Sequence, residues 1–266
     1  MTIVTGKRIL AVITGASRGI GKQIAISMAS DCAPESAFVL LARNAQLLEQ
    51  VKAEIRELNI KAKVAVIIAD FSSDKPIEKL EETIKTLTQG EQIEAKFIFH
   101  NAGTIGDVAK SASDLTNTQD WHEYLHINLI SMIALNCQLY KILSEINDLK
   151  TIVVNTTSLA ALQPISSFTQ YCVGKAAREA YFRNFALETE SRVLNYSPGP
   201  VETDMITEIG KSSFDPQIRE MFSPTSTHST DSHRKRLSPK ETVSKLIAII
   251  DKNEFENGGR VDYFDS

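Results

Sequence analysis

The chain has 266 residues, of which 42% are hydrophobic and 23% charged, a balance typical of one large folded domain or two small ones and unlike that of a disordered chain. Its 29 Lys and Arg residues against 33 Asp and Glu residues give a net charge of -4, which argues against general nucleic-acid binding. The three widely spaced cysteines, Cys32, Cys137 and Cys172, form neither a disulfide framework nor a zinc pattern, so we expect no metal site.

Apolar runs are short throughout the sequence, and residues 64–69 are typical of the longest. A membrane span needs about 20 apolar residues, and the apolar stretch at 9–13 is too short for a secretory signal. We therefore expect a cytoplasmic protein with no membrane partner and no nucleic-acid partner.

Short β-branched runs alternate with longer segments of helical spacing along the whole chain. The runs expected to form strands are 8–13, 37–42, 63–69, 96–100, 151–156, 192–197 and 260–264. The segments expected to form helices are 21–29, 45–58, 77–87, 121–143, 171–189 and 239–251. This alternation predicts an α/β fold over residues 1–266: a single doubly wound Rossmann-type domain whose mostly parallel, seven-stranded sheet has helices on both faces.

One segment, about 200–238, breaks the alternation. Its centre at 223–232 is rich in Ser and Thr, and a basic run follows at 233–236. Loops this long in compact domains are usually lids or disordered insertions. We expect a mobile loop here and read the basic run as a solvated stretch.

A glycine-rich turn links the first predicted strand to the first predicted helix. Glycines there permit a tight turn and let a pyrophosphate approach the backbone, while the helix N-terminus offers free N–H groups. In this context the motif predicts a dinucleotide site. The residues expected to contact the dinucleotide here are Gly15, Ser17, Arg18, Gly19, Ile20 and Gly21.

The end of the second predicted strand bears on the choice of cofactor. A site that prefers NAD usually places a carboxylate there for the ribose 2′-hydroxyl, whereas this chain has Arg43. Arg43 and Arg18 are both positioned to meet a 2′-phosphate, so the sequence favours NADPH over NADH. The further contacts expected at the ends of strands two, three and four are Asn44, Asp70, Phe71, Asn101, Ala102 and Gly103.

Tyr171 and Lys175 lie four residues apart in a predicted helix and therefore share one face. A free tyrosine titrates near pH ~10, and a nearby ammonium together with an oxidised nicotinamide lowers that pKa. Tuned in this way, Tyr171 can donate a proton to a carbonyl oxygen while hydride arrives at carbon. Ser158 would hydrogen-bond and orient the same oxygen. Asn128 would hold a water that connects Lys175 to solvent.

These motifs occur in an order that resembles the short-chain dehydrogenase/reductase family, and the match runs from about residue 8 to the C-terminus. The resemblance implies that Asn128, Ser158, Tyr171 and Lys175 carry the catalytic roles just given. It also implies that Lys175 binds the nicotinamide ribose. The cofactor contacts that it implies after the sixth strand are Pro198, Gly199, Val201, Thr203 and Met205.

Segments that lie outside the general motifs or extend them resemble the members of this family that reduce pterin side-chain carbonyls. They are 40–44, 161–164, 171–178, 194–200 and 261–265. This resemblance implies a pterin substrate whose 2-amino group and ring N–H are bound by Asp262, because one carboxylate can accept both bonds. The resemblance also implies that residues 200–238 cover the substrate. The other substrate contacts implied are Ser158, Leu159, Gln163, Tyr171, Cys172, Gly199 and Met205.

The family resemblance further implies a homodimer formed by the helices predicted over 121–143 and 171–189. Two other functions remain open at this point. One is a broad-specificity NADPH-dependent carbonyl or dicarbonyl reductase with the same site and no pterin anchor. The other is a catalytically silent NADPH-binding sensor or scaffold, which would have no need of a general acid.

Overall fold

The structure is a computed structural model that describes residues 2–73, 77, 79–223 and 236–265. Seven strands form one parallel sheet in the order β3-β2-β1-β4-β5-β6-β7. Their bounds are β1 Ile9–Thr14, β2 Ala37–Ala42, β3 Lys63–Ile68, β4 Ala95–His100, β5 Thr151–Thr156, β6 Arg192–Ser197 and β7 Arg260–Asp262. This is the doubly wound order predicted from the alternation, and the fold class is confirmed.

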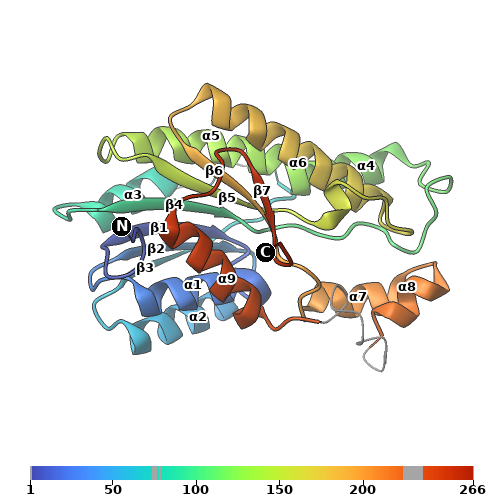
Figure 1. Ribbon diagram of the computed structural model, residues 1–266, viewed down its shortest axis with the longest axis horizontal. Helices are drawn as coiled ribbons and strands as arrows, with labels where there is room; N and C mark the ends of the chain where they lie inside the picture. Colours follow the sequence, from blue (N-terminus) through green and yellow to red (C-terminus); the bar gives the residue numbers. More distant parts are fainter. Residues whose placement is uncertain (1, 74–76, 78, 224–235, 266) are drawn as a thin grey trace.

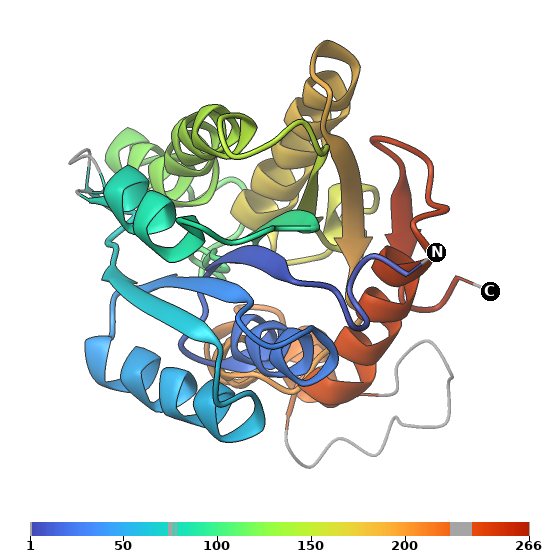
Figure 2. The ribbon, with the colours of Figure 1, turned by 90° about the vertical axis from the view of Figure 1, so that its left-hand side faces the viewer.

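Helices cover both faces of the sheet, as Figures 1 and 2 show. One layer contains α1 Gly19–Asp31, α2 Ala45–Leu58 and α9 Pro239–Lys252. The other contains α3 Leu80–Thr88, α5 Ser131–Ser144 and α6 Thr169–Glu188.

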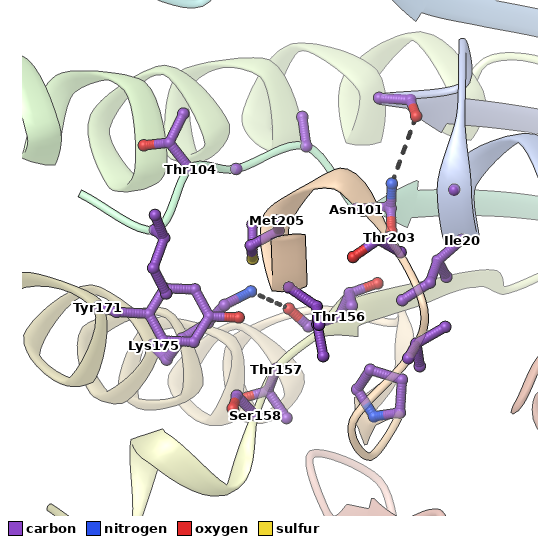
Figure 3. Close-up of a pocket in the computed structure, with 18 of the residues that line it drawn as sticks. Ile20, Asn101, Thr104, Thr156, Thr157, Ser158, Tyr171, Lys175, Thr203 and Met205 are labelled. Atoms are coloured by element: carbon purple, nitrogen blue, oxygen red, sulfur yellow. Dashed lines mark hydrogen bonds between the residues drawn. The ribbon is translucent and has the colours of Figure 1, made fainter. Parts of the chain in front are cut away.

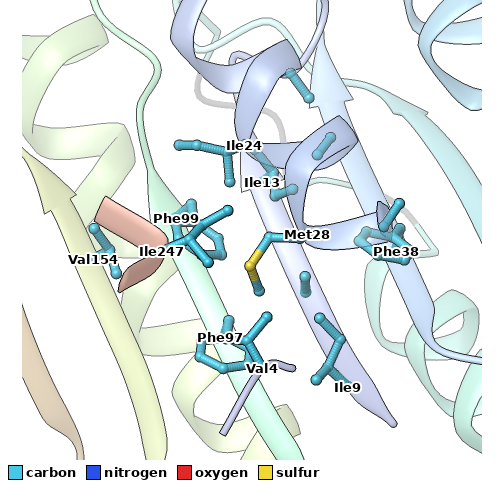
Figure 4. Packing of buried hydrophobic residues seen from close by; sticks show 14 of the residues in the cluster. Val4, Ile9, Ile13, Ile24, Met28, Phe38, Phe97, Phe99, Val154 and Ile247 are labelled. Atoms are coloured by element: carbon cyan, nitrogen blue, oxygen red, sulfur yellow. The ribbon is translucent and has the colours of Figure 1, made fainter. Parts of the chain in front are cut away.

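The residues of β1 show why both faces need cover. Ile9, Ala11 and Ile13 belong to the core cluster under α1 and α9, whereas Leu10 and Val12 belong to the cluster under α5 and α6. Successive strand residues point to opposite faces, so a strand that is apolar throughout must be buried on both sides. Figure 4 shows the first cluster, in which Met28 of α1 lies among side chains from several strands and from α9.

The helix predicted over 121–143 is longer and less regular in the structure. It consists of α4 Thr118–Leu125, a π-helical turn His126–Ile130, and α5. By length and composition alone, the stretch Thr118–Ser144 meets the criteria for a membrane span, so the expectation that no stretch would do so was wrong. Its buried side chains, among them Met132, Leu135 and Leu139, pack into the core, as those of the core helix of a water-soluble protein also do.

The segment predicted as a loop over 200–238 contains two helices, α7 Asp204–Ser212 and α8 Pro216–Met221. Ile206 and Ile209 are spaced for one buried helix face, and the Asp215 carboxylate caps α8 ahead of Pro216. These local signals override the polar composition. The Ser/Thr-rich centre and most of the basic run lie outside the described residues.

Several boundaries differ from expectation by one to three residues, among them those of α3 and β7. α3 begins at Leu80 and not at Ile77. β7 ends at Asp262 and not at Phe264, because the Asp262 carboxylate accepts a hydrogen bond from the Phe264 N–H (3.1 Å) and turns the chain.

Candidate active site

A cleft of about 1780 Å³ opens along the carboxyl edge of the sheet. Residues that follow each of the seven strands line it, and α7 and α8 lie beside the same edge (Figure 1). The strand order reverses between β1 and β4, and this switch point is where doubly wound sheets bind their ligands. The cleft is therefore the candidate active site.

The glycine turn leaves no space for side chains at the bottom of this cleft. Gly15 has a φ of +66°, and a Cβ on Gly21 would lie 2.3 Å from the Gly15 carbonyl oxygen. α1 begins at Gly19, so the N–H groups of its first turn, which have no partners within the helix, face the cleft. A backbone cradle that only glycine fits, at a helix N-terminus, suits a pyrophosphate.

A hydroxyl joins this turn to the end of β4. Thr14 Oγ1 accepts from the backbone N–H groups of Asn101 (3.0 Å) and Ala102 (3.1 Å) and donates to the Phe99 carbonyl. The Asn101 side-chain amide donates in return to the Thr14 carbonyl at 3.3 Å. The two strands at the switch point are thus fixed relative to each other, as dinucleotide binding across them requires.

At the far end of the cleft, the two arginines differ in their surroundings. Arg43 is exposed. Hydrogen bonds from Ser72 are the main cause of the lowered pKa of Asp70, and the charge of Arg43 lowers that pKa further. Arg18 forms an ion pair with Asp204 at 2.6 Å. Arg18 is therefore bound to the first residue of α7 in this structure, and only Arg43 has the surroundings that the sequence predicted. Asn44 lines the same end and caps α2 through the Leu47 N–H.

Tyr171, Lys175 and Ser158 meet at the other end of the cleft (Figure 3). The Lys175 ammonium lies 5.3 Å from the centre of the Tyr171 ring and donates to the Thr156 carbonyl at 2.6 Å. Ser158 lies at the start of a 3-10 turn, Leu159–Ala161, where its hydroxyl accepts from the Ala160 N–H. The structure thus brings together three of the four residues expected to be catalytic.

The electrostatics of this group differ from the sequence interpretation. Burial raises the pKa of Tyr171 to about 12, opposed by Arg178 and by hydrogen bonding from Ser158. Burial also lowers the pKa of Lys175 well below its ordinary value, and Arg178 lowers it further. We expected Lys175 to be the cation that favours the phenolate. In the structure a residue that the sequence reasoning missed, Arg178, has that effect.

Asn128, the fourth expected catalytic residue, lies in the π-helical turn and is buried outside the cleft lining. Its side-chain oxygen accepts from the Thr104 N–H (2.7 Å), and its amide donates to Thr104 Oγ1 and to the Tyr124 carbonyl. The side chain therefore holds the loop after β4 against α4. A water link from Asn128 to Lys175 stays a prediction.

Asp262 lies at the carboxyl end of β7, inside the cleft, with its side chain 20% exposed. Arg260 donates weakly to it at 3.5 Å. Arg260 also donates to the Ser158 carbonyl (3.1 Å) and forms an ion pair with Glu179, which is 2% exposed and accepts from Thr157. The sequence analysis identified neither Arg260 nor Glu179, which connect β7 to the segment that carries Ser158.

A largely apolar wall adjoins Tyr171 in the cleft. Phe168 packs against Tyr171 and against Phe222, with ring centres 6.0 and 6.1 Å apart. The other apolar residues of this wall that line the cleft are Ile105, Ile165, Met205, Ile209 and Ile218. Most of them come from the segment predicted as a loop, whose helices could have been anticipated only from the spacing of its few isoleucines.

The cleft lining includes nearly all of the residues predicted for it. Those at the cofactor end are Gly15, Ser17, Arg18, Gly19, Ile20, Arg43, Asn44, Asp70, Phe71, Asn101, Ala102, Gly103, Pro198, Gly199, Val201, Thr203 and Met205, and those at the substrate end are Ser158, Leu159, Gln163, Tyr171, Lys175 and Asp262. Three predicted residues, Gly21, Asn128 and Cys172, are not among the lining residues. Within the described ranges, no cluster of side chains suits a metal ion.

Comparison with known proteins indicates the same family that the sequence motifs resemble. The family model described as short chain dehydrogenase matches residues 10–213. The chain is 33% identical to sepiapterin reductase of Bos taurus over 259 residues, which cover 97% of this chain and 95% of that protein. It is 32% identical to sepiapterin reductase of Rattus norvegicus over 257 residues, or 96% of each. L-sorbose reductase from Gluconobacter frateurii, solved with NADPH and L-sorbose, aligns with a TM-score of 0.78 at 20% identity over 98% of this chain and 97% of that one. That last likeness concerns the fold alone.

Proposed function

Because the chain belongs to the short-chain dehydrogenase family, we propose that it is an NADPH-dependent reductase of side-chain ketones on a pterin, of the sepiapterin reductase type. The family makes it an oxidoreductase that uses a nicotinamide cofactor; the preference for NADPH and the pterin are the proposal. The reactions proposed are sepiapterin to dihydrobiopterin and 6-pyruvoyl-tetrahydropterin to tetrahydrobiopterin.

The residues at the cofactor end of the cleft fit a dinucleotide. The cradle at Gly15 and Gly21 would be filled by any Cβ, so it suits a ligand that touches the backbone. The N–H groups of the first turn of α1 would hold the pyrophosphate, and Arg43 would hold a 2′-phosphate. When bound, the nicotinamide supplies the hydride.

Tyr171 donates the proton, and the residues beside it orient the substrate and the phenol. With a pKa raised to about 12, the Tyr171 phenol keeps its proton at neutral pH and is ready to donate it to a carbonyl oxygen. Ser158, hydrogen-bonded to the same phenol, orients that oxygen. Lys175, fixed on the Thr156 carbonyl, holds the phenol ring in place.

The observation that supports the pterin best is the position of Asp262. A carboxylate offers about four acceptor positions, and Arg260 and the Phe264 N–H occupy two of them. The remaining positions can accept the adjacent 2-amino group and ring N–H of a pterin. An end-of-strand acid in the cleft is thus available for the anchoring role.

The apolar wall favours a second candidate, a broad-specificity carbonyl or dicarbonyl reductase. Phe168, Phe222 and the isoleucines of α7 and α8 would bind an aromatic or aliphatic dicarbonyl without any help from Asp262. The two candidates share the proton donor and differ only in the anchor.

Replacement of Asp262 by Asn separates them. We expect the KM for sepiapterin to rise about tenfold or more, because hydrogen bonds to a charged group are lost, while the kcat/KM for a small diketone stays the same. Glu256→Gln, an exposed acid just before β7, is the matched control. Unchanged sepiapterin kinetics in a folded Asp262→Asn protein would leave the dicarbonyl reductase as the better assignment.

The proposal also includes a cytoplasmic location, a homodimer and a single domain. The described cysteines are all free, which suits the cytoplasm. Ile130, Val173 and Leu187 are exposed apolar residues of the π-helical turn and of α6, and they support the homodimer through these helices. A monomeric mass in sedimentation at micromolar concentration would contradict the dimer. We propose residues 1–266 as one domain.

A further inference from the structure

Arg178 is buried in the protein to a degree that is unusual for a charged side chain, with 1% of its surface exposed. It follows Tyr171 by seven residues and Lys175 by three in α6, a spacing that places all three on one helix face. A Cβ on Gly103, which lines the cleft, would lie 3.9 Å from Arg178 Nη1. The guanidinium therefore lies directly behind the wall of the active site.

All hydrogen-bond acceptors of Arg178 are uncharged. Nη2 donates to the His100 carbonyl (2.7 Å), Nη1 to the Ala102 (3.0 Å) and Asn128 (3.3 Å) carbonyls, and Nε to the side-chain oxygen of Asn155 (2.9 Å). Within the part of the chain that the structure describes, no carboxylate pairs with it. A buried charge without a counterion is costly. Because no counterion cancels the charge of Arg178, its positive field acts on neighbouring ionisable groups.

The next residue, Glu179, does not neutralise this charge. Its carboxylate is turned toward Arg260 and Thr157, about a quarter-turn around the helix from its neighbour. Although burial lowers the pKa of Arg178 itself to about 10, the side chain is still a cation at neutral pH.

Several titratable groups face this region. From α6 itself they are Tyr171, Cys172 and Lys175, and from other elements they are Tyr124 of α4 and His100 of β4. The Ser158 hydroxyl, which does not titrate, hydrogen-bonds Tyr171. Burial lowers the pKa of His100 to about 3, so that ring is neutral. Lys175 also has a lowered pKa. With a pKa of about 10, the Arg178 guanidinium stays charged across the neutral range.

We propose that Arg178 is a positioning residue whose buried charge stabilises the phenolate that Tyr171 becomes when it gives its proton to the substrate oxygen. In that step the phenolic O–H bond breaks and the proton bonds to the carbonyl oxygen, while a hydride that the C–H bond of a bound reduced nicotinamide would supply bonds to the carbonyl carbon. The negative charge stays on the phenolate until solvent returns a proton. The four hydrogen bonds of Arg178 hold its charge at a fixed place behind the site. The inference rests on the proposed role of Tyr171 and adds a second cation to it.

Charge and shape can be varied separately at this position. Arg178→Gln removes the charge and keeps polar atoms, whereas Arg178→Lys keeps a charge and loses most of the bridging bonds. Asn155→Asp leaves Arg178 intact and gives it a carboxylate partner of the same shape. Arg183→Gln, an exposed arginine of the same helix, is the control.

The first readout is the phenolate absorbance of each protein with a fluorinated tyrosine at position 171, minus that of the same protein carrying Tyr171→Phe, titrated with pH without cofactor or substrate. Ring fluorines lower the pKa of a phenol, so the titration falls in the range where Arg178, with a pKa of about 10, is still charged. We expect the midpoint to rise by about one to three pH units in Arg178→Gln and in Asn155→Asp, to rise less in Arg178→Lys, and to stay unchanged in Arg183→Gln. The second readout is kcat at neutral pH, which should fall about tenfold per unit of that shift at most.

A merely structural role gives a different result. The variants would lose thermal stability while the midpoint stayed in place, and that outcome would overturn the proposal. If Arg178→Gln does not fold, Asn155→Asp decides, since it keeps the arginine. Because the titration needs no substrate, it tests Arg178 even where a pterin or diketone assay shows that the proposed reaction is wrong.

Discussion

The Gly21→Ala protein tests the cofactor end of the cleft. An added Cβ would lie 2.3 Å from the Gly15 carbonyl oxygen and 2.6 Å from the Asn101 amide nitrogen. The nearer atom belongs to the backbone and cannot rotate away, so α1 must shift by about 1 Å from the glycine turn to restore ordinary van der Waals contact. Gly15 and Asn101 line the cleft, so the shift distorts the surface that meets the dinucleotide.

The magnitude follows from two opposing effects. Overpacking a tight site costs about 1–3 kcal/mol, and alanine regains up to about 1 kcal/mol of helix propensity relative to glycine. We therefore expect the free energy of unfolding to fall by about 1 kcal/mol. Loss of one hydrogen bond to a charged phosphate weakens NADPH binding about tenfold or more.

Urea unfolding measures the first effect, and nicotinamide fluorescence on titration with NADPH measures the second. Ser30→Ala, an exposed change on the same helix, is the control and should leave both quantities unchanged. A Gly21→Ala protein that binds NADPH like the wild type and is equally stable would refute the reasoning that the glycine turn is a cradle without room for side chains.

Four further predictions concern single side chains. Tyr171→Phe should lower kcat by about 100-fold or more by removing the proton donor, with NADPH affinity retained; an undiminished rate of NADPH oxidation would rule out the mechanism. Arg43→Ala should weaken NADPH binding about tenfold and leave NADH binding unchanged, and calorimetric titrations that show equal losses for both would contradict the 2′-phosphate contact. Burial lowers the pKa of His100 from 6.5 to about 3, so between these pH values the unfolded chain binds a proton that the native chain does not. The free energy of unfolding should therefore fall as the pH drops from 6.5 toward 3, by at most about 1.4 kcal/mol per pH unit. An equal slope in His100→Asn would show that another group is responsible. Glu179→Gln removes the buried carboxylate partner of Arg260 and leaves it the longer contact with Asp262 at 3.5 Å. This change should cost about 3 kcal/mol in urea unfolding, whereas a loss within error would mean that the pair is dispensable.

The fold could be predicted from the sequence because the strands are apolar on both faces. Runs such as Leu40-Leu41-Ala42 cannot be buried in a single core layer, and the intervening helical spacing leaves few topologies. The same reasoning failed for α7 and α8, where Ile206, Ile209 and Ile218 lie among polar residues. A short helix that buries two or three side chains carries too weak a periodic signal to be distinguished from a loop.

Site residues could be predicted where their roles follow from local motifs. The prediction was incomplete where roles depend on contacts between residues far apart in the sequence. Arg178 and Glu179 lie in a helix of mixed composition, where charged residues suggest an exposed face, and only the spacing of Arg178 from Tyr171 hinted that it is buried. The π-helical turn around Asn128 has no compositional signature, so its side chain was expected near Lys175. Structure alone shows that this side chain holds the Thr104 loop.

The measurement that tests the central claim most directly is the initial rate of nicotinamide oxidation by the wild-type protein with sepiapterin, in parallel with NADPH and with NADH, and again with a small diketone. We predict a clear preference for sepiapterin over the diketone and for NADPH over NADH. Turnover of the diketone equal to or faster than that of sepiapterin would contradict the pterin assignment, and equal rates with the two cofactors would contradict the role given to Arg43.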